Sequence, residues 1–218
     1  MIEAAIFDMD GTLVDNTAYH VRAFELFCER YGVRDWREKL ATAFGKGNDD
    51  IMRLIMPEEV IREKGIEALA EEKEAIYRAI YAPAIRPVAG LRKLLERLRA
   101  AGIRCAVGSS GCRTNVEFVL ERCGIGAYFD VRISGDMVTR CKPDPEIYRT
   151  AAAALEVDPA RCVIFEDAKA GIEAARRGGA GRIVVLTTTL PREELEREVG
   201  VDRIIDDFGD IRSVDELR

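Results

Sequence analysis

The sequence contains little that would support a nucleic-acid-binding or membrane protein. Its 33 lysine and arginine residues are outnumbered by 39 aspartate and glutamate residues, which gives a net charge of −6. The basic residues are mixed with acidic ones, and no basic run is present that could follow a nucleic-acid backbone. No apolar run approaches the roughly 20 residues that a membrane-spanning helix requires. We therefore expect neither a nucleic acid nor a membrane as a partner.

Cysteine and histidine are too scattered to form a structural zinc site. His20 is the only histidine, and no two cysteines are spaced as Cys-x-x-Cys. The six cysteines lie at positions 28, 105, 112, 123, 141 and 162. Several of them fall within apolar runs, where a reduced thiol serves as a small hydrophobic side chain. The N-terminal segment also lacks the basic start and apolar stretch of a signal peptide, so we expect a cytoplasmic protein.

Short apolar runs alternate with segments of helical periodicity over most of the chain. The apolar runs are Ile2–Phe7, Ile103–Val107, Cys162–Phe165 and Arg182–Leu186. Two helical segments each place four apolar residues on one face, at 91, 94, 95 and 98 and at 116, 119, 120 and 123. Buried strands that alternate with helices predict an α/β fold with a doubly wound, Rossmann-like parallel sheet.

Residues 16–83 break this alternation. They carry no strand signal and show only helical patterning, which is interrupted near Gly45–Asn48 and at Pro57. We interpret this segment as a small α-helical cap domain that is inserted into an α/β core domain made of residues 1–15 and 84–218. The connections that would act as hinges are Val14–Asn16 and Pro83–Pro87.

Polar residues follow three of the predicted strands directly. They are Asp8 and Asp10 after the first strand, Ser109 and Ser110 after the second, and Glu166 and Asp167 after the third. In an open α/β sheet, ligands bind outside the carboxyl ends of the strands, so these side chains should converge. Four carboxylates in one crevice would repel one another unless a cation lay among them. Ligands that are all oxygen atoms favour a hard ion such as Mg²⁺.

The same crevice has the components of a phosphate site. Lys142, in a loop before a predicted helix, would add positive charge, and the loops at Gly11 and Ser110 would add amide and hydroxyl donors. Each pattern alone has an ordinary explanation: Asp-x-Asp as a turn or helix cap, and Lys-Pro-Asp-Pro as a helix start. Their joint occurrence at the predicted strand ends favours phosphoryl transfer.

Four segments of the sequence resemble, in order, the motifs of the haloacid dehalogenase-like (HAD) superfamily. They are DMDGTLVD at 8–15, the Ser109 loop, CKPDPEIY at 141–148 and FEDAKAGIEAA at 165–175. The resemblance extends along essentially the whole chain. The helical insert resembles the mobile cap of the subgroup that contains β-phosphoglucomutase and related sugar-phosphate phosphatases.

The resemblance implies a role for each residue of the motifs. Asp8 would be the nucleophile that becomes an aspartyl phosphate, and Asp10 would be the general acid and base. Ser109 and Lys142 would hold the oxygens of the phosphoryl group. The implied Mg²⁺ ligands are the Asp8 carboxylate, the main-chain carbonyl of Asp10, and the side chains of Asp167 and Glu166.

The resemblance also implies substrate-binding residues in the insert. His20 matches a histidine that contacts the acid/base aspartate and the sugar in β-phosphoglucomutase, and Lys73 matches a substrate-binding lysine. A solvated lysine in the charged run EEKE is the competing interpretation of Lys73. Where the mutase has an arginine that grips a second phosphate, this sequence has Asn48, with Lys46 nearby. Arg113, in a loop that differs in length, is a candidate to replace that arginine.

These observations lead to three interpretations of function. The first is a Mg²⁺-dependent phosphatase that acts on a small phosphorylated metabolite, such as a sugar phosphate, through an aspartyl phosphate. The second is a phosphomutase of the β-phosphoglucomutase type, and the third is a non-catalytic protein that binds a phosphometabolite. The complete set of catalytic residues argues against the third interpretation. A small phosphorylated substrate is the expected partner, and the expected form is a monomer.

Overall fold

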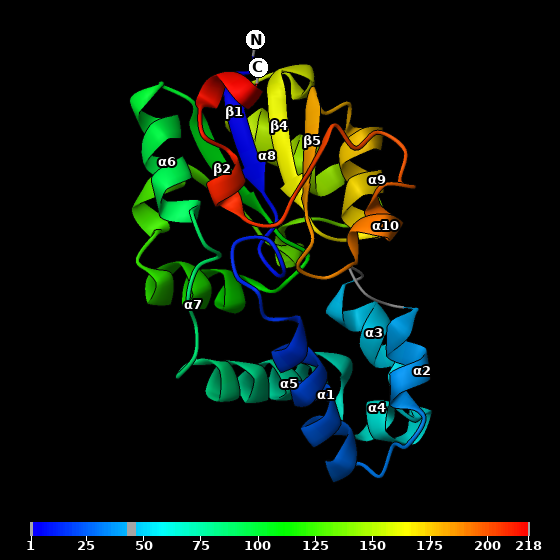
Figure 1. Ribbon diagram of the computed structural model, residues 1–218. Helices are drawn as coiled ribbons and strands as arrows, with labels where there is room; N and C mark the ends of the chain where they lie inside the picture. The colour runs from blue at the N-terminus through cyan, green and yellow to red at the C-terminus, as the bar shows by residue number, and fades with distance from the viewer. Residues whose placement is uncertain (1, 43–46, 218) are drawn as a thin grey trace.

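A parallel sheet forms the centre of the protein. Within residues 2–42 and 47–217, which the computed structural model describes, the sheet has six strands in the order β3-β2-β1-β4-β5-β6 (Figure 1). The strands are β1 (Ala4–Phe7), β2 (Arg104–Gly108), β3 (Val131–Ile133), β4 (Cys162–Glu166), β5 (Arg182–Leu186) and β6 (Arg203–Ile205). The predicted α/β fold class with a parallel, Rossmann-like sheet is confirmed.

Helices cover both faces of this sheet (Figure 1). They are α6 (Leu91–Ala100), α7 (Arg113–Cys123), α8 (Glu146–Ala154), α9 (Lys169–Gly178) and α10 (Arg192–Leu195). In β1, Ala5 and Phe7 pack in the cluster that contains the leucines of α6, whereas Ala4 and Ile6 pack in the cluster of α8 and α9. Because side chains alternate between the faces of a strand and both faces are covered, the central strands are apolar throughout.

The strands and helical faces predicted from the apolar patterns are present. The four predicted apolar runs correspond to β1, β2, β4 and β5, and all four leucines predicted on one face of α6 are fully buried. The strands β3 and β6 were not predicted. Each has three residues, lies at an edge of the sheet and contains an arginine, so its apolar pattern is too short to be detected.

The helical insert lies at the carboxyl end of the strands, on the opposite side of the molecule from the two termini (Figure 1). Its helices are α1 (Thr17–Arg30), α2 (Trp36–Ala41), α3 (Asn48–Ile55), α4 (Glu58–Lys64) and α5 (Ile66–Tyr81). The insert has an apolar cluster of its own, built around Phe27, Trp36, Met52 and Leu69. We use the term helical insert for residues 17–81.

The two connections between the helical insert and the sheet lie side by side. Val14 forms isolated bridges with Asp10 and Pro87, and the Val88 N–H donates to the Leu13 carbonyl at 2.9 Å. These contacts fix the point at which the chain leaves β1 and returns to α6.

No helix in the described part of the chain is long and apolar enough to cross a membrane.

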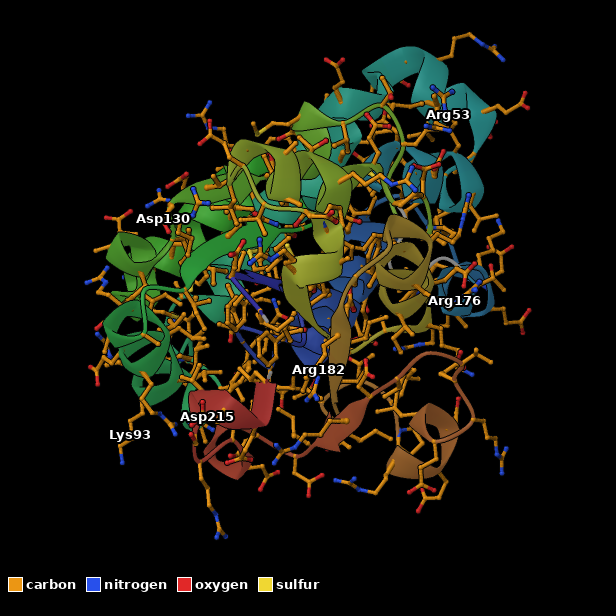
Figure 2. All side chains as sticks on the ribbon, turned by 90° about the horizontal axis from the view of Figure 1, so that it is seen from above. Arg53, Lys93, Asp130, Arg176, Arg182 and Asp215 are labelled. Atoms are coloured by element: carbon orange, nitrogen blue, oxygen red, sulfur yellow. The ribbon has the colours of Figure 1, made fainter. Side chains whose placement is uncertain are left out.

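Charged side chains lie on the outside of this arrangement. Figure 2 shows Lys93 of α6 and Asp130, before β3, at the rim of the molecule, and Arg53 on the helical insert. The buried charged residues are different: they lie together where the helical insert faces the sheet.

Candidate active site

Three buried carboxylates meet at the ends of β1 and β4. Asp8 follows β1, Glu166 ends β4, and Asp167 comes directly after it. The two strands pair in register, and the Asp8 N–H donates to the Phe165 carbonyl at 2.9 Å, so their ends coincide. One carboxylate oxygen from each of the three residues lies within 4.8 Å of the other two. The convergence that was expected from the strand order is therefore present.

A single buried lysine opposes this negative charge. Lys142 Nζ lies 2.5 Å from Asp8 Oδ1 and 2.7 Å from Glu166 Oε1. Burial would lower the pKa of Lys142, but the charges of Asp8 and Glu166 outweigh it and raise the pKa, so the ammonium group stays protonated. One positive charge among three carboxylates leaves the cluster short of positive charge.

Because of burial and this lack of positive charge, the pKa values of Asp8 and Asp167 are raised. Burial, followed by the charges of Glu166 and Asp10, raises the pKa of Asp8 to about 7 even though Lys142 lowers it. Burial, Glu166 and Asp8 likewise raise the pKa of Asp167 well above its ordinary value. A cation among these oxygens would favour their ionised forms. Because the donors are all oxygen atoms, the cluster has the composition and spacing of a site for a hard metal ion.

Glu166 differs from its two neighbours because both of its oxygens are already occupied. Oε1 accepts hydrogen bonds from Lys142 and from the Tyr148 hydroxyl, the latter at 2.5 Å. Oε2 accepts from the backbone N–H groups of Asp167 at 2.9 Å and Ala168 at 3.1 Å. Glu166 therefore positions Lys142, and the oxygens of Asp8 and Asp167 are the ones better placed for a metal. Tyr148 was not among the residues predicted for the site.

Replacing Gly171 with alanine should destabilise the protein. A Cβ atom at this position of α9 would lie 1.6 Å from Glu166 Oε1, so Glu166 would have to move away from Lys142. We expect a loss of about 1–3 kcal/mol in the free energy of unfolding, measured by denaturant titration, together with weaker catalysis. Gly178→Ala in the same helix is the control, because its added Cβ would lie 3.7 Å from the nearest atom. Equal stability of the two variants would contradict this account.

The second aspartate of the first motif, Asp10, faces the helical insert. Asn16 Nδ2 donates to Asp10 Oδ1 at 2.6 Å, and His20 Nε2 lies 3.4 Å from the same oxygen. Burial would raise the pKa of Asp10, but His20 and Asn16 outweigh it and hold the pKa below its usual value. The His20 ring stacks on Tyr77 with 3.9 Å between ring centroids. Asn16 Nδ2, which donates to Asp10, also donates to the Tyr77 hydroxyl. Asp10 is therefore held ionised and oriented from the insert side.

The serine loop follows β2. Ser109 and Ser110 line the same cavity as Asp8 and Lys142, and Ser109 is almost fully buried. The Ser109 N–H donates to Ile133 of β3 at 3.0 Å, and its hydroxyl accepts from the Gly111 N–H at 3.0 Å. The edge strand that the sequence did not reveal thus fixes the position of a predicted catalytic serine.

Gly11 has a structural contribution that the sequence pattern did not indicate. It does not line the cavity, and its N–H already donates to the Val14 carbonyl at 2.8 Å and to the Asn16 side chain. Its φ is +83°, a conformation that favours glycine, and a Cβ would lie 2.1 Å from Asp167 Oδ2. Glycine at this position therefore allows Asp167 to approach the first motif.

The residues predicted for substrate binding divide into three groups. His20, Lys73 and Asn48 line the cavity together with the catalytic residues. Arg113 is exposed and lines a separate hollow next to β3, away from that cavity. Lys46 lies outside the described residues.

A crevice lined by residues of the four motifs lies at the carboxyl ends of the parallel strands, and the helical insert covers it. This combination of fold and site is that of a phosphate-transferring hydrolase. A model of the haloacid dehalogenase-like hydrolase family matches residues 2–179, and the chain belongs to this family. The family and the enzyme class expected from the sequence, a phosphoric monoester hydrolase, are confirmed.

Several known proteins are similar to the chain over nearly its whole length. Protein CbbY of Cereibacter sphaeroides is 36% identical, with 97% of this chain and 94% of that protein covered. The validoxylamine A 7′-phosphate phosphatase of Streptomyces hygroscopicus subsp. limoneus is 34% identical, with 97% of each covered. The crystal structure of a CbbY mutant from Rhodobacter sphaeroides with xylulose-(1,5)bisphosphate has a TM-score of 0.83 and 30% identity, covering 100% of this chain and 99% of that one.

Proposed function

We propose that this protein is a Mg²⁺-dependent phosphatase that removes phosphate from a small phosphorylated metabolite of the sugar-phosphate type. The observation that carries the proposal is the buried contact of Asp8 with Lys142, beside Asp167 and opposite an ionised Asp10. The names of the relatives support the substrate class, since they include the validoxylamine A 7′-phosphate phosphatase and a phosphorylated carbohydrates phosphatase of Thermotoga maritima that is 29% identical.

The arrangement supports a reaction in two steps. Asp10 first takes up a proton from solvent or from the substrate monoanion. In the first step, a carboxylate oxygen of Asp8 attacks phosphorus, the bond from phosphorus to the leaving oxygen breaks, and Asp10 gives this proton to that oxygen. In the second step, Asp10 takes a proton from water, which attacks the aspartyl phosphate and releases Asp8 and inorganic phosphate. Ser109 and Lys142 bind the oxygens of the phosphoryl group as their charge redistributes.

The metal would be held by Asp8 and Asp167, with the main-chain carbonyl of Asp10 beside them. Bound there, Mg²⁺ would supply the positive charge that the cluster lacks and reduce the repulsion between Asp8 and an anionic substrate. The helical insert closes the same cavity from the other side, where it orients the leaving group and excludes water from it.

One feature of the cavity favours a phosphatase over a phosphomutase. A phosphomutase must hold a second phosphate on the insert side while the first one is transferred. There the cavity presents Asn48, and no arginine lines it within the described residues. An asparagine cannot provide the charged, bidentate contact with phosphate that arginine provides.

Phosphate release from a panel of phosphorylated compounds, measured with and without Mg²⁺, tests the proposal. The panel should contain p-nitrophenyl phosphate, several sugar phosphates, and β-glucose 1-phosphate with a trace of glucose 1,6-bisphosphate. We expect Mg²⁺-dependent release of phosphate from the sugar phosphates. If isomerisation to glucose 6-phosphate is faster than phosphate release, the mutase interpretation is correct, and no turnover of any compound would overturn the proposed activity.

A further inference from the structure

The insert side of the cavity contains a buried ion pair between neighbouring residues of α5. Lys73 Nζ lies 2.5 Å from Glu74 Oε1, both residues are 2% exposed, and both line the cavity. The other oxygen of Glu74 accepts a hydrogen bond from Asn115 Nδ2 of α7 at 2.6 Å. Arg78 holds Asn115 in turn, by donating to its Oδ1 at 2.8 Å. The carboxylate is therefore fixed from both the insert and the sheet side.

Lys73 keeps donors that this pair does not use. An ammonium group has three N–H donors, and within the described residues the contacts of Lys73 are the hydrogen bond to Glu74 and the face of Phe24, whose ring centre is 4.5 Å from Nζ. Lys73 can thus donate to a substrate hydroxyl. Its charge, however, is already compensated by Glu74 at hydrogen-bond distance.

The other described residues of this wall are uncharged. Phe24, Leu40, Ile51 and Asn48 form it together with the pair. Within the described residues, the other lysine and the histidine that line the cavity are Lys142 and His20, which contact Asp8 and Asp10. The arginine of α3, Arg53, is exposed on the helical insert (Figure 2) and does not line this cavity, but it lines an adjoining hollow that shares Asn48, Ser110 and Lys142 with it. Among the lysines and arginines of the described residues, Lys73 is therefore the one that lies on this wall, and Glu74 compensates its charge.

We propose that the Lys73–Glu74 pair makes this site selective for monophosphates whose leaving group is uncharged, and that Glu74 excludes a second phosphate. The inference rests on the proposed phosphatase function. Lys73 binds a hydroxyl of the leaving group, and Phe24, Leu40 and Ile51 pack against its carbon atoms. The preferred substrate class is accordingly the monophosphate of a neutral polyol.

The physical reason is the cost of burying an uncompensated charge. A second phosphate on the insert side would leave water and meet a lysine whose charge is already paired, next to a carboxylate that repels it. A hydroxyl group needs only a donor or an acceptor, and the pair offers both. The pair thus provides hydrogen bonds without net charge.

Two variants with opposite changes in charge test this role. Glu74→Gln leaves Lys73 unpaired, so kcat/KM for fructose 1,6-bisphosphate relative to fructose 1-phosphate should rise about tenfold or more. Lys73→Gln leaves Glu74 unpaired, so the same ratio should fall. Glu72→Gln is the matched control, because Glu72 also lies on α5 and pairs with a cation, Arg30 at 2.8 Å, but lies outside the cavity and the contacts that hold Glu74. Its ratio should equal that of the parent protein.

The parent protein should itself prefer fructose 1-phosphate to the bisphosphate. An equal or reversed preference, or ratios that do not move in opposite directions in Glu74→Gln and Lys73→Gln, would overturn the inference. Hydrolysis of p-nitrophenyl phosphate by each variant verifies that the protein is folded and active. If the parent protein hydrolyses neither this reagent nor either fructose phosphate with Mg²⁺, the proposed phosphatase function fails, and not only the selectivity.

Discussion

Replacing Asp8 with asparagine should reduce phosphatase turnover by about 10⁴-fold or more, the scale seen when a covalent nucleophile is removed. The side chains are nearly identical in shape, but a neutral amide cannot attack phosphorus to form an acyl phosphate. The fold should survive, because burial already raises the pKa of Asp8 and the change removes a charge from a crowded cluster. The measurement is the rate of phosphate release with saturating Mg²⁺.

The matched control for this variant is Asp35→Asn. It makes the same chemical change at an exposed aspartate of the helical insert, whose partner is Lys39. We expect this control to retain the activity of the parent protein. Substantial activity in Asp8→Asn, after deamidation and contamination have been ruled out, would contradict a covalent mechanism at this residue.

Changes at the two acidic residues after β4 should have unequal effects on the metal dependence. Asp167→Asn should raise the Mg²⁺ concentration for half-maximal activity strongly and lower turnover by about 10³-fold or more at the concentration that saturates the parent protein. Glu166→Gln should raise that concentration less, within about 10–100-fold, because Glu166 already accepts four hydrogen bonds and acts by positioning Lys142.

This comparison is made by titrating Mg²⁺ into chelator-treated protein and measuring phosphate release. Full activity in excess chelator would mean that the carboxylates do not bind a metal ion needed for catalysis. An unchanged Mg²⁺ dependence in Asp167→Asn would remove Asp167 from the metal site.

The sequence reveals the sheet and its catalytic end because both depend on local patterns. A strand covered on both faces is a continuous apolar run. Because the strands are parallel, Asp8, Ser109 and Asp167 all lie at the carboxyl end of the sheet. Nothing about the insert is needed to infer that these residues meet. For this reason the core residues that were predicted to lie together do so.

The contacts that orient these residues are not visible in the sequence. Asn16 precedes α1 and has the pattern of a helix cap, yet its side chain contacts Asp10 and Tyr77 instead. Tyr148 is an ordinary apolar position of α8 by its spacing, although its hydroxyl reaches Glu166. Each of these bonds joins segments that are brought together only by tertiary packing, so a one-dimensional pattern carries no signal for it.

Lys73 illustrates the same limit. In the run EEKE it is indistinguishable from a solvated lysine, but it is 2% exposed and paired with the next residue. Its burial depends on how α5 lies against α7, where Asn115 meets Glu74. The sequence identified Lys73 as a candidate substrate contact, and the compensation of its charge becomes apparent only in three dimensions.

The central claim is that Asp8 carries the phosphoryl group during the reaction. Mass spectrometry of an Asp10→Ala variant mixed with acetyl phosphate and Mg²⁺ tests it most directly. This substrate has a leaving group that needs little protonation, whereas water attack on the intermediate lacks its base, so the intermediate should accumulate. We predict one phosphoryl group on the peptide that contains Asp8 and none in the double variant Asp8→Asn/Asp10→Ala. A phosphoryl group on a different residue, or none while the parent protein hydrolyses acetyl phosphate, would contradict the account.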